Sequence, residues 1–324
     1  MSLRIIKAGV LDTIQDIGRY GSQYLGVNPG GVMDRFSAQL ANALIGKALN
    51  APVIEMHFPA SHILFEKPAI ISICGADFSP TINNQPIPVH YPIAVNETSL
   101  LKFNAHKNGA RCYLSVLQDI QVDNWMNSFS TNLKAHVGGH YGRTLDKFDQ
   151  LGFINKIDMS FLRQKDFMIL PWRAADFVEN RNEIEFTMGS EWHWLTKESQ
   201  ELFQTSWYQV TNEADRMGYR LAGQKLETGD HEQLVSSAVN FGTVQLLPGG
   251  QLIILMADHQ TIGGYPRIAH VISAHLPIIA QKEPNHVMQF RLTSLETSEE
   301  KIIKQQKYLR EIQIACKFRI ESLS

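Results

Sequence analysis

A ten-residue stretch late in the chain carries the densest set of groups that could contact a ligand. Residues 258–267 read DHQTIGGYPR, and two adjacent glycines, Gly263 and Gly264, permit a tight bend with accessible N–H groups. The side chains that can donate or accept hydrogen bonds are those of Asp258, Gln260, Thr261 and Arg267. From the residues alone, the stretch is either a binding loop or a turn whose polar groups satisfy one another.

Two arginines upstream have a spacing that suggests an acidic group between them. Arg216 and Arg220 are four residues apart in the segment ADRMGYRLAG. On a helix they would share a face, where like charges repel unless an acid or an anionic ligand lies between them. Asp215 could serve as that acid, and the alternative is a carboxylate or phosphate on a ligand.

Two glycine-rich segments earlier in the chain each contain one arginine. The first, QDIGRYG, includes Asp16 and Arg19, and the second, residues 128–143, combines serines, a threonine and glycines with Arg143. Glycine lets backbone N–H groups approach a ligand, and arginine can hold a carboxylate or an oxyanion. The alternatives are an internal Asp16–Arg19 pair that shapes a surface loop, and a solvated loop at 128–143.

The chain lacks the signatures of several other kinds of site. It contains no phosphate loop and no nucleophile elbow, and its 12 histidines include no His-Glu-x-x-His. The three cysteines are widely separated, which favours buried reduced thiols over a disulfide framework or a metal site. Thirty Lys and Arg against 32 Asp and Glu give a net charge of -2. This balance argues against nucleic acid or an anionic membrane as the main partner.

The N-terminal residues predict a protein that stays in the cytoplasm. MSLRIIKAGVLDTIQDIGR contains charge within a few residues of its start and has no signal-peptide core. No apolar run approaches the roughly 20 residues that a membrane helix needs.

Short strands must position most of these groups. Apolar runs such as HILFEKPAIISICG, CYLSVLQDI, SWYQV, TVQLL and QLIILMAD are separated by Gly, Pro and Asn signals. Such punctuation is typical of barrels and sandwiches, so we expect a mainly β fold. The stretch at 258–267 follows the last of these strands directly, and loops at strand ends often carry function.

Two helices are expected beside the strands. Residues 34–45 begin with Asp34 as a cap and are followed by Gly46. Near the C-terminus, Thr297-x-x-Glu300 resembles a capping box. An apolar stripe that should pack onto the protein body follows it: Ile302, Leu309, Ile312, Cys316 and Ile320.

The chain divides into two predicted lobes. We expect an N-terminal β lobe at 1–146, a polar connection at 147–182 and a second lobe with the C-terminal helix at 183–324. A weak internal echo supports this division. MDRFSAQLAN and ADRMGYRLAG share Asp-Arg and Leu-Ala at one offset, and an aspartate follows each at the same interval, in CGADF and LMADHQ. The echo hints at duplication.

These clusters lie in stretches that together resemble the biotin-dependent carboxyltransferase family. The family includes the C subunit of 5-oxoprolinase, allophanate hydrolase subunit 2, the Kip antagonist proteins and the second half of the carboxyltransferase part of urea carboxylase. The main stretches are TIQDIGRYG, GVMDRFSAQLANALIG, STNLKAHVGGHYGRTL, ADRMGYRLAG and GTVQLLPGGQLIILMADHQTIGGYPRIAHVI. They run from about residue 5 to residue 292, in the family's order.

The resemblance implies two cyclophilin-like β-barrel lobes with a few helices and a C-terminal helix. It also implies a subunit of ATP-dependent 5-oxoprolinase, which cleaves 5-oxo-L-proline to L-glutamate with a Kip-inhibitor-like B subunit and a LamB/YcsF-type A subunit. A biotin-dependent carboxyltransferase component acting on urea or a related amide is the alternative, and it would need a separate biotin carrier. A third possibility is a regulator that binds a Kip-type kinase inhibitor without doing chemistry.

With the resemblance, the 258–267 stretch becomes a ligand-facing loop. We assign catalytic roles to Asp258 and Arg267. The residues assigned to substrate binding are Arg19, Arg143, Arg216, Arg220, Gln245, Gln260, Thr261, Gly263, Gly264 and Tyr265.

The chain departs from the family pattern at four places. Leu117-Gln118-Asp119-Ile120 replaces a usual Gly-Gly-Ile, and Ser236-Ser237-Ala238 replaces Ser-Glu-Gly. His275 stands where an aspartate is usual, and Gly189-Ser190 where Gly-Pro is usual. These changes predict either reduced activity or a different substrate preference.

Overall fold

The computed structural model contains two compact units, and strands dominate both, which confirms the mainly β fold. It describes residues 2–162, 165–175, 182–229 and 234–323. Unit 1 consists of Met1–Gly18, Asp34–Asp176 and Gln306–Ser324, and unit 2 of Arg19–Met33 and Phe177–Gln305.

Unit 1 is built on two six-stranded sheets, with the orders β11-β1-β4-β9-β6-β7 and β12-β8-β5-β10-β3-β2. The strands are β1 (Leu3–Lys7), β2 (Thr13–Gln15), β3 (Val53–Met56), β4 (His62–Phe65), β5 (Ala69–Asp77), β6 (Pro80–Ile82), β7 (Gln85–Pro86), β8 (Pro92–Val95), β9 (Leu100–Phe103), β10 (Asn108–Val116), β11 (Gln150–Leu151) and β12 (Phe167–Ile169). Aliphatic and aromatic side chains from both sheets, among them Ile5, Phe65 and Leu114, share one buried core.

Part of the segment expected as a connection, residues 147–182, belongs to these sheets. In β11, Leu151 pairs with Leu3, and in β12, Met168 pairs with Ala94. Leu151 is buried in the unit 1 core, so a short apolar run ties this otherwise polar segment to the sheets. Residues 163–164 and 176–181 of the expected connection lie outside the described residues.

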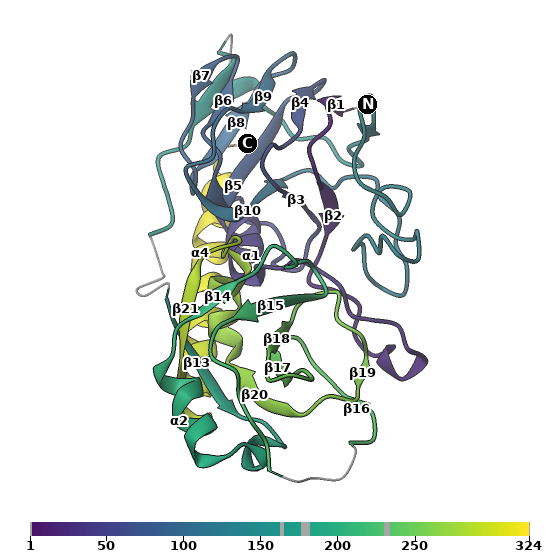
Figure 1. The fold of residues 1–324 in the computed structure, drawn as a ribbon. Coiled ribbons are helices and arrows are strands. Elements are labelled where there is room, and N and C mark those ends of the chain that lie inside the picture. The colour runs from purple at the N-terminus through teal and green to yellow at the C-terminus, as the bar shows by residue number, and fades with distance from the viewer. Residues whose placement is uncertain (1, 163–164, 176–181, 230–233, 324) are drawn as a thin grey trace. The chain divides into compact units, whose positions relative to one another are not determined.

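The helix predicted at 34–45 is confirmed as α1 (Arg35–Leu44). The side chain of Asp34 accepts a hydrogen bond of 2.8 Å from the N–H of Ser37, which is the expected cap. The apolar face of α1 lies against β5 and β10 (Figure 1). Unit 1 also contains the short 3₁₀ helix η2 (Ser160–Leu162).

Unit 2 contains a closed seven-stranded barrel with the order β13-β20-β17-β18-β15-β14-β21. Parallel pairing of β13 with β21 closes it. Its strands are β13 (Glu183–Met188), β14 (Tyr208–Val210), β15 (Gly218–Ala222), β17 (Thr243–Leu246), β18 (Leu252–Leu255), β20 (Arg267–Val271) and β21 (Val287–Leu292). A closed barrel is therefore confirmed for unit 2, whereas the described strands of unit 1 form two six-stranded sheets.

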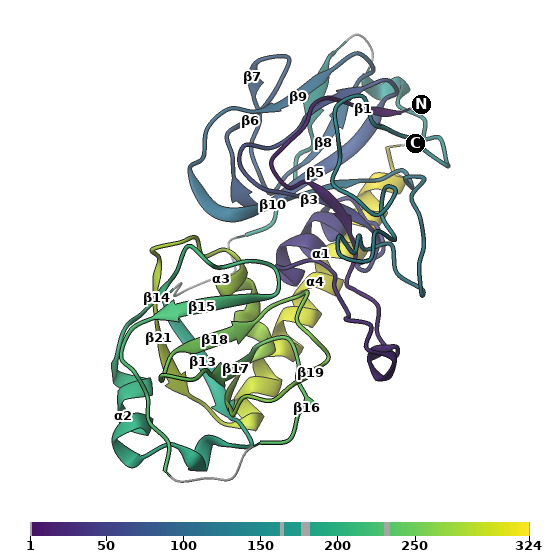
Figure 2. The same ribbon diagram turned by 45° about the vertical axis from the view of Figure 1, so that its right-hand side comes forward.

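A two-stranded ribbon and several short helices accompany the barrel (Figure 2). The ribbon pairs β16 (Ser237–Ala238) with β19 (Ile262–Gly263). The helices of this unit that the sequence pattern did not predict are α2 (Lys197–Thr205), α3 (Leu276–Ala280), η1 (Gln23–Leu25), η3 (Trp192–Trp194) and η4 (Ser273–His275). They were missed because each is short; α2 is mostly polar and is held by a Thr196 cap and by Phe203, which stacks on Phe290.

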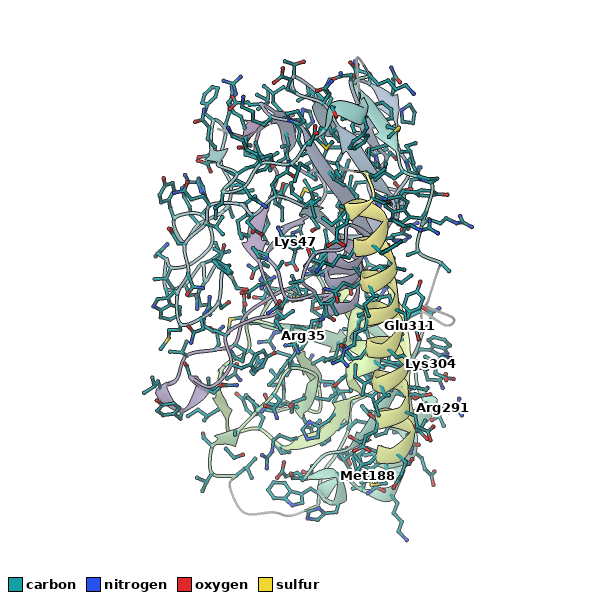
Figure 3. The ribbon with its side chains drawn as sticks, turned by 180° about the vertical axis from the view of Figure 1, so that it is seen from behind. Arg35, Lys47, Met188, Arg291, Lys304 and Glu311 are labelled. Carbon is teal, nitrogen blue, oxygen red and sulfur yellow. The ribbon has the colours of Figure 1, made fainter. Side chains whose placement is uncertain are left out.

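The C-terminal helix is confirmed as α4 (Leu295–Glu321), from which Lys304 and Glu311 project in Figure 3. Leu309 and Cys316 of the predicted stripe are buried. The predicted cap is wrong: the hydroxyl of Ser294 accepts a 3.2 Å hydrogen bond from the N–H of Thr297, so the helix starts three residues earlier. No helix among the described residues has both the length and the apolarity to cross a membrane.

The internal echo is not a structural repeat. Arg35 begins helix α1, whereas Arg216 precedes strand β15. After Asp34 come residues with good helix propensity and an amphipathic pattern. After Asp215 come Met217 and Gly218, and the following residues alternate between buried and exposed positions, as a strand requires.

Candidate functional site

A pocket of about 400 Å³ lies against the outer face of the unit 2 barrel. We call it the barrel pocket. It is lined by Glu213, Asp215, Met217, Gly218, Arg220, Gln245, Leu247, Pro248, Gln251, Ile253, Leu255, Gln260 and Tyr265. Four of the predicted substrate-binding residues are among them: Arg220, Gln245, Gln260 and Tyr265.

Strand register explains why these side chains meet. Arg220 on β15 and Gln245 on β17 are both paired with Ile253 on the central strand β18. Directly paired residues project from the same face of a sheet. Their neighbours Tyr219 and Ile254 belong to the buried barrel core, so the alternate residues face outward and form the pocket floor.

At the rim of the pocket, two charged side chains form a solvent-exposed ion pair. The guanidinium of Arg220 lies 3.1 Å from the carboxylate of Glu213, with side-chain exposures of 47% and 73%. An ion pair this exposed contributes little to stability, so Arg220 can exchange Glu213 for an anionic ligand at small cost. Asp215 is used differently: its carboxylate accepts the N–H groups of Met217 and Gly218 at 2.7 and 3.0 Å and shapes the turn into β15.

The side-chain amides of Gln245 and Gln260 line one part of the pocket, which we call the amide wall. The position of Gln245 depends on the close approach of the β16–β19 ribbon. Gln245 is buried, and its Nε2 donates a 3.2 Å hydrogen bond to the carbonyl of Tyr265. A Cβ atom at Gly263 would lie 2.7 Å from that Nε2, so only glycine fits there without moving Gln245. At Gly264 the nearest atom to an added Cβ is the Ser236 hydroxyl at 3.2 Å, which is a milder contact.

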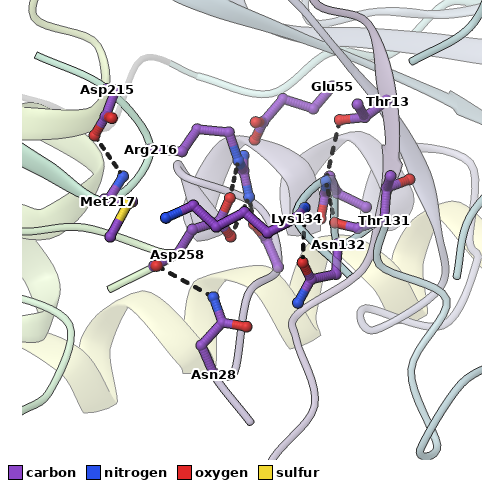
Figure 4. Close-up of polar contacts among 12 residues, drawn as sticks. Thr13, Asn28, Glu55, Thr131, Asn132, Lys134, Asp215, Arg216, Met217 and Asp258 are labelled. Carbon is purple, nitrogen blue, oxygen red and sulfur yellow. Dashed lines mark hydrogen bonds and ion pairs between the residues drawn. The ribbon is translucent and has the colours of Figure 1, made fainter. Parts of the chain in front are cut away.

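Asp258, to which the sequence assigns a catalytic role, forms an ion pair in the structure. Its carboxylate accepts Nε and Nη2 of Arg216 at 2.8 and 3.1 Å (Figure 4). Arg216 Nη2 also donates to the carbonyl of Gly31 at 2.6 Å, and Asn28 Nδ2 donates to the carbonyl of Asp258 at 3.1 Å. The pair therefore anchors the segment at 28–31 to the end of β18.

Arg267, the other residue with a predicted catalytic role, is also paired. Its Nε and Nη2 donate to the two carboxylate oxygens of Glu191 at 2.9 and 2.7 Å, and Nη1 donates to the carbonyl of Ala238 at 3.2 Å. Burial acts to raise the pKa of Glu191, but the hydrogen bonds from Arg267 outweigh it and hold this pKa below its ordinary value.

The remaining predicted residues do not line the barrel pocket. Arg143 belongs to unit 1, where it makes two hydrogen bonds to Asp149 at 2.6 and 2.7 Å. Arg19 is buried in unit 2, and its backbone N–H donates to the carbonyl of Pro29 at 2.8 Å. The carbonyl of Thr261 accepts the N–H of Val239 beside the ribbon.

Sequence reasoning missed the apolar half of the pocket. The apolar run QLIILMAD predicts a buried strand. In the structure, Leu252 and Ile254 face the core, whereas Ile253 and Leu255 line the pocket. The glycine at position 218 was the sequence signal that could have indicated the pocket floor. It leaves room for Ile253, because a Cβ atom at Gly218 would lie 2.7 Å from Ile253 Cδ1.

Three of the four departures from the family pattern have local structural roles. The carbonyl of Gln118 accepts a 3.0 Å hydrogen bond from the buried ammonium of Lys47, which also lies 3.3 Å from Asp119. Ala238 is part of the ribbon and accepts from Arg267. His275 Nδ1 accepts the N–H of Glu185 at 3.0 Å.

Chemically, the barrel pocket offers three kinds of contact. It has one exchangeable arginine at the rim, three glutamine amides with a tyrosine beside them, and an apolar floor. This set suits a small molecule that combines an anionic group, an amide and a short apolar segment.

Known proteins are similar to this chain along almost its whole length. The family described as carboxyltransferase domain, subdomain A and B, matches residues 25–292. The C subunit of 5-oxoprolinase from Haemophilus influenzae is 33% identical over 300 residues, which cover 93% of this chain and 94% of that protein. The protein of the same name from Escherichia coli is 33% identical over 310 residues, covering 96% and 97%.

Larger proteins match through a part of their length. Urea amidolyase of Saccharomyces cerevisiae is 29% identical over 315 residues, which cover 92% of this chain but 17% of that enzyme. Among solved structures, Kluyveromyces lactis urea carboxylase matches with a TM-score of 0.87 and 25% identity, covering 96% of this chain and 29% of that one. TTHA0988 matches in fold, with a TM-score of 0.77 and 24% identity, covering 90% of this chain and 55% of that one.

Proposed function

Because this chain belongs to the family of carboxyltransferase domains, subdomain A and B, we propose that it is the C-type subunit of an ATP-dependent 5-oxoprolinase. In this role it would bind 5-oxo-L-proline while an assembly with A and B subunits converts it to L-glutamate. One observation carries the proposal: four residues chosen from the sequence for substrate binding line a single pocket. Full-length similarity to two proteins named as the C subunit of 5-oxoprolinase favours this member of the family.

The groups of 5-oxo-L-proline correspond to the groups of the barrel pocket. Its carboxylate requires a cation, which Arg220 supplies after leaving Glu213. Its ring amide carries one donor and one acceptor, and the amides of Gln245 and Gln260 offer both. Its ring methylenes fit the floor formed by Ile253 and Leu255.

The chain's own residues would bind and orient the lactam. Gln245 is held by its hydrogen bond to Tyr265, so its amide needs little reorganisation when a ligand arrives. A ring fixed between this amide wall and Arg220 would present its carbonyl in one orientation. Orientation of this kind is a large part of enzymatic rate enhancement.

We propose that ATP binds outside the barrel pocket. Opening an unstrained lactam is uphill, and coupling to ATP makes it favourable. The charged lining residues of the barrel pocket are Arg220, Glu213 and Asp215. One arginine beside two carboxylates does not suit a triphosphate, so we assign ATP binding to a location outside this pocket and derive no step from it.

The proposal is tested by reconstituting the assembly. The full chain, expressed together with A and B subunits of 5-oxoprolinase, should release glutamate from 5-oxo-L-proline, and release should require ATP. A complete, folded trio that shows no ATP-dependent release would refute the proposal. Arg291→Ala supplies a matched control for pocket variants, because Arg291 forms an exposed 3.0 Å ion pair with Glu183 and does not line the pocket.

A second candidate function follows from the urea amidolyase and urea carboxylase matches. As a biotin-dependent carboxyltransferase component, the chain would present the same pocket to urea or a related amide. Urea has no carboxylate, so Arg220 would be dispensable for its binding. Transfer of carboxylate from a carboxybiotin donor, unaffected by Arg220→Ala, would favour this function, and the absence of transfer from any such donor would remove it. A third function is that of a regulator. If the chain bound a Kip-type inhibitor tightly and showed neither oxoprolinase nor carboxyltransferase activity, this function would be favoured.

A further inference from the structure

The rim of the barrel pocket carries a cation and an anion side by side. The guanidinium of Arg220 lies 3.1 Å from the carboxylate of Glu213, and both residues line the pocket. An α-amino acid carries its carboxylate and its ammonium group on one carbon atom, so a neighbouring cation and anion match it group for group. The rim therefore has the charge pattern of a site for an α-amino acid.

The two acids of the pocket are held in different ways. Oδ1 of Asp215 accepts the N–H groups of Met217 and Gly218 at 2.7 and 3.0 Å, so this carboxylate is fixed in the turn before β15 (Figure 4). Among the described residues, the ion pair with Arg220 is the only polar contact of the Glu213 carboxylate. Because that pair is exposed and weak, Glu213 is the acid that can change partners at small cost.

Hydrogen bonds hold the main chain at Glu213. Its N–H donates to the hydroxyl of Thr211 at 3.3 Å, and the N–H of Thr211 donates to the carbonyl of Arg220 at 3.0 Å. The segment that joins β14 to β15 is thus tied to Arg220, and only the side chain of Glu213 has to rotate when it leaves the guanidinium. Such an acid loses less entropy on binding a ligand than one on a mobile segment would.

The proposed reaction creates an ammonium group beside a carboxylate. In net terms, hydrolysis breaks the bond between the ring nitrogen and the carbonyl carbon of 5-oxo-L-proline. The oxygen of one water molecule goes to that carbon, which becomes the second carboxylate, and both protons of the water go to the nitrogen. The nitrogen and the original carboxylate stay on one carbon atom. The new ammonium group therefore forms next to the carboxylate that Arg220 is proposed to hold.

We infer that Glu213 is a product-binding residue of the barrel pocket, an inference that rests on the proposed function. The carboxylate of 5-oxo-L-proline displaces Glu213 from Arg220, and the displaced acid then binds the ammonium group of L-glutamate. The lactam N–H is a single neutral donor, whereas an ammonium group has three donors and a full charge. Glu213 therefore favours the open-chain product over the lactam, and it determines which of the two ligands the pocket prefers.

The test is a calorimetric titration of the full chain with 5-oxo-L-proline, with L-glutamate and with glutarate, which is L-glutamate without its ammonium group. Glu213→Gln removes the charge and keeps the size of the side chain. It should weaken the binding of L-glutamate by about 10-fold or more, as the loss of a charge-assisted hydrogen bond does. It should tighten 5-oxo-L-proline and glutarate by about 2- to 5-fold, because Arg220 no longer has a competing carboxylate.

The matched control is Glu183→Gln. Glu183 forms an exposed ion pair of the same kind, 3.0 Å from Arg291, and does not line the pocket. Its replacement should leave the affinities for all three ligands unchanged. Shifts of the same sign for L-glutamate and glutarate, unchanged affinities in Glu213→Gln, or equal shifts in the control would each overturn the inference. So would a wild-type chain that binds none of the three ligands.

The outcomes separate this inference from the proposed function. ATP-dependent release of glutamate by the complete assembly, together with L-glutamate binding that Glu213→Gln does not change, would overturn the inference and leave the function standing. Binding of L-glutamate that depends on Glu213, in an assembly that releases no glutamate from 5-oxo-L-proline, would refute the function and leave an α-amino acid site.

Discussion

Arg216 and Asp258, 42 residues apart in the sequence, form an ion pair with two hydrogen bonds of 2.8 and 3.1 Å. The same guanidinium holds the carbonyl of Gly31. One residue pair thus joins the end of β18, the approach to β15 and the segment at 28–31. Both residues were chosen from the sequence as ligand contacts, and their geometry gives them a structural task as well.

Replacing Asp258 by asparagine should destabilise unit 2 by about 2 kcal/mol, because it leaves the charge of a buried arginine without its counter-charge. Urea unfolding followed by tryptophan fluorescence measures this. Asp258→Asn with wild-type stability and no glutamate release would instead support the catalytic role predicted from the sequence.

Arg267→Ala should lower stability by about 2 to 3 kcal/mol, since it leaves the carboxylate of Glu191 buried without its main donors. The double variant Arg267→Met/Glu191→Gln should regain part of that loss. A double-mutant cycle of unfolding free energies checks the coupling. Additive losses in the cycle would show that the pair is not coupled and would return Arg267 to a role in catalysis.

Arg220→Ala should raise the KM for 5-oxo-L-proline at least 10-fold, with a smaller change in kcat, because Arg220 is proposed to hold the substrate carboxylate. Stability should change by less than about 0.5 kcal/mol, since its ion pair with Glu213 is exposed. Arg291→Ala is the control and should leave KM unchanged. Equal effects of the two variants on KM would refute the assignment.

Gly263→Ala should reduce activity several-fold, because its methyl group would lie 2.7 Å from Gln245 Nε2 and displace that amide. Gly264→Ala, whose nearest contact is a hydroxyl at 3.2 Å, should be tolerated better. Steady-state kinetics of the two variants, with circular dichroism to verify folding, compares them. A greater loss at Gly264 would contradict this account of the amide wall.

In unit 1, Asp12 should contribute a component of stability that is lost as the pH rises from 4 to 6. Burial raises the pKa of Asp12 from 3.8 to about 6, although hydrogen bonds from Ser61 and His57 act in the opposite direction. The folded state therefore binds a proton more tightly than the unfolded state, and its contribution is present below pH 4 and is lost as the pH rises through 6. The higher pKa of Asp12 in the folded state corresponds to about 2 to 3 kcal/mol of unfolding free energy. Unfolding of Asp12→Asn across this range should lack that component, and an unchanged slope would exclude Asp12 as its source.

Local signals predicted the elements well wherever they were strong. Asp34 and Gly46 mark the two ends of α1, and the apolar runs TVQLL and QLIILMAD mark β17 and β18. The segment of Arg216 and Arg220, which we considered as a helix, instead leads into strand β15. Helix α2 was missed because its first turn is polar and its packing residue, Phe203, has no apolar partner at helical spacing within the segment. The start of α4 was placed late because Thr297 and Ser294 are both good caps, and only the backbone geometry chooses between them.

The sequence by itself determined the family, the mainly β class and which segments are rich in hydrogen-bonding side chains. These properties depend on residue types and short-range periodicity. Tertiary structure alone decided which of those residues meet. Strand register brings Arg220 and Gln245 to one face of β18, whereas Arg267 is paired with Glu191, a residue 76 positions away. Such pairings depend on how strands distant in the chain align, and no local pattern encodes that alignment.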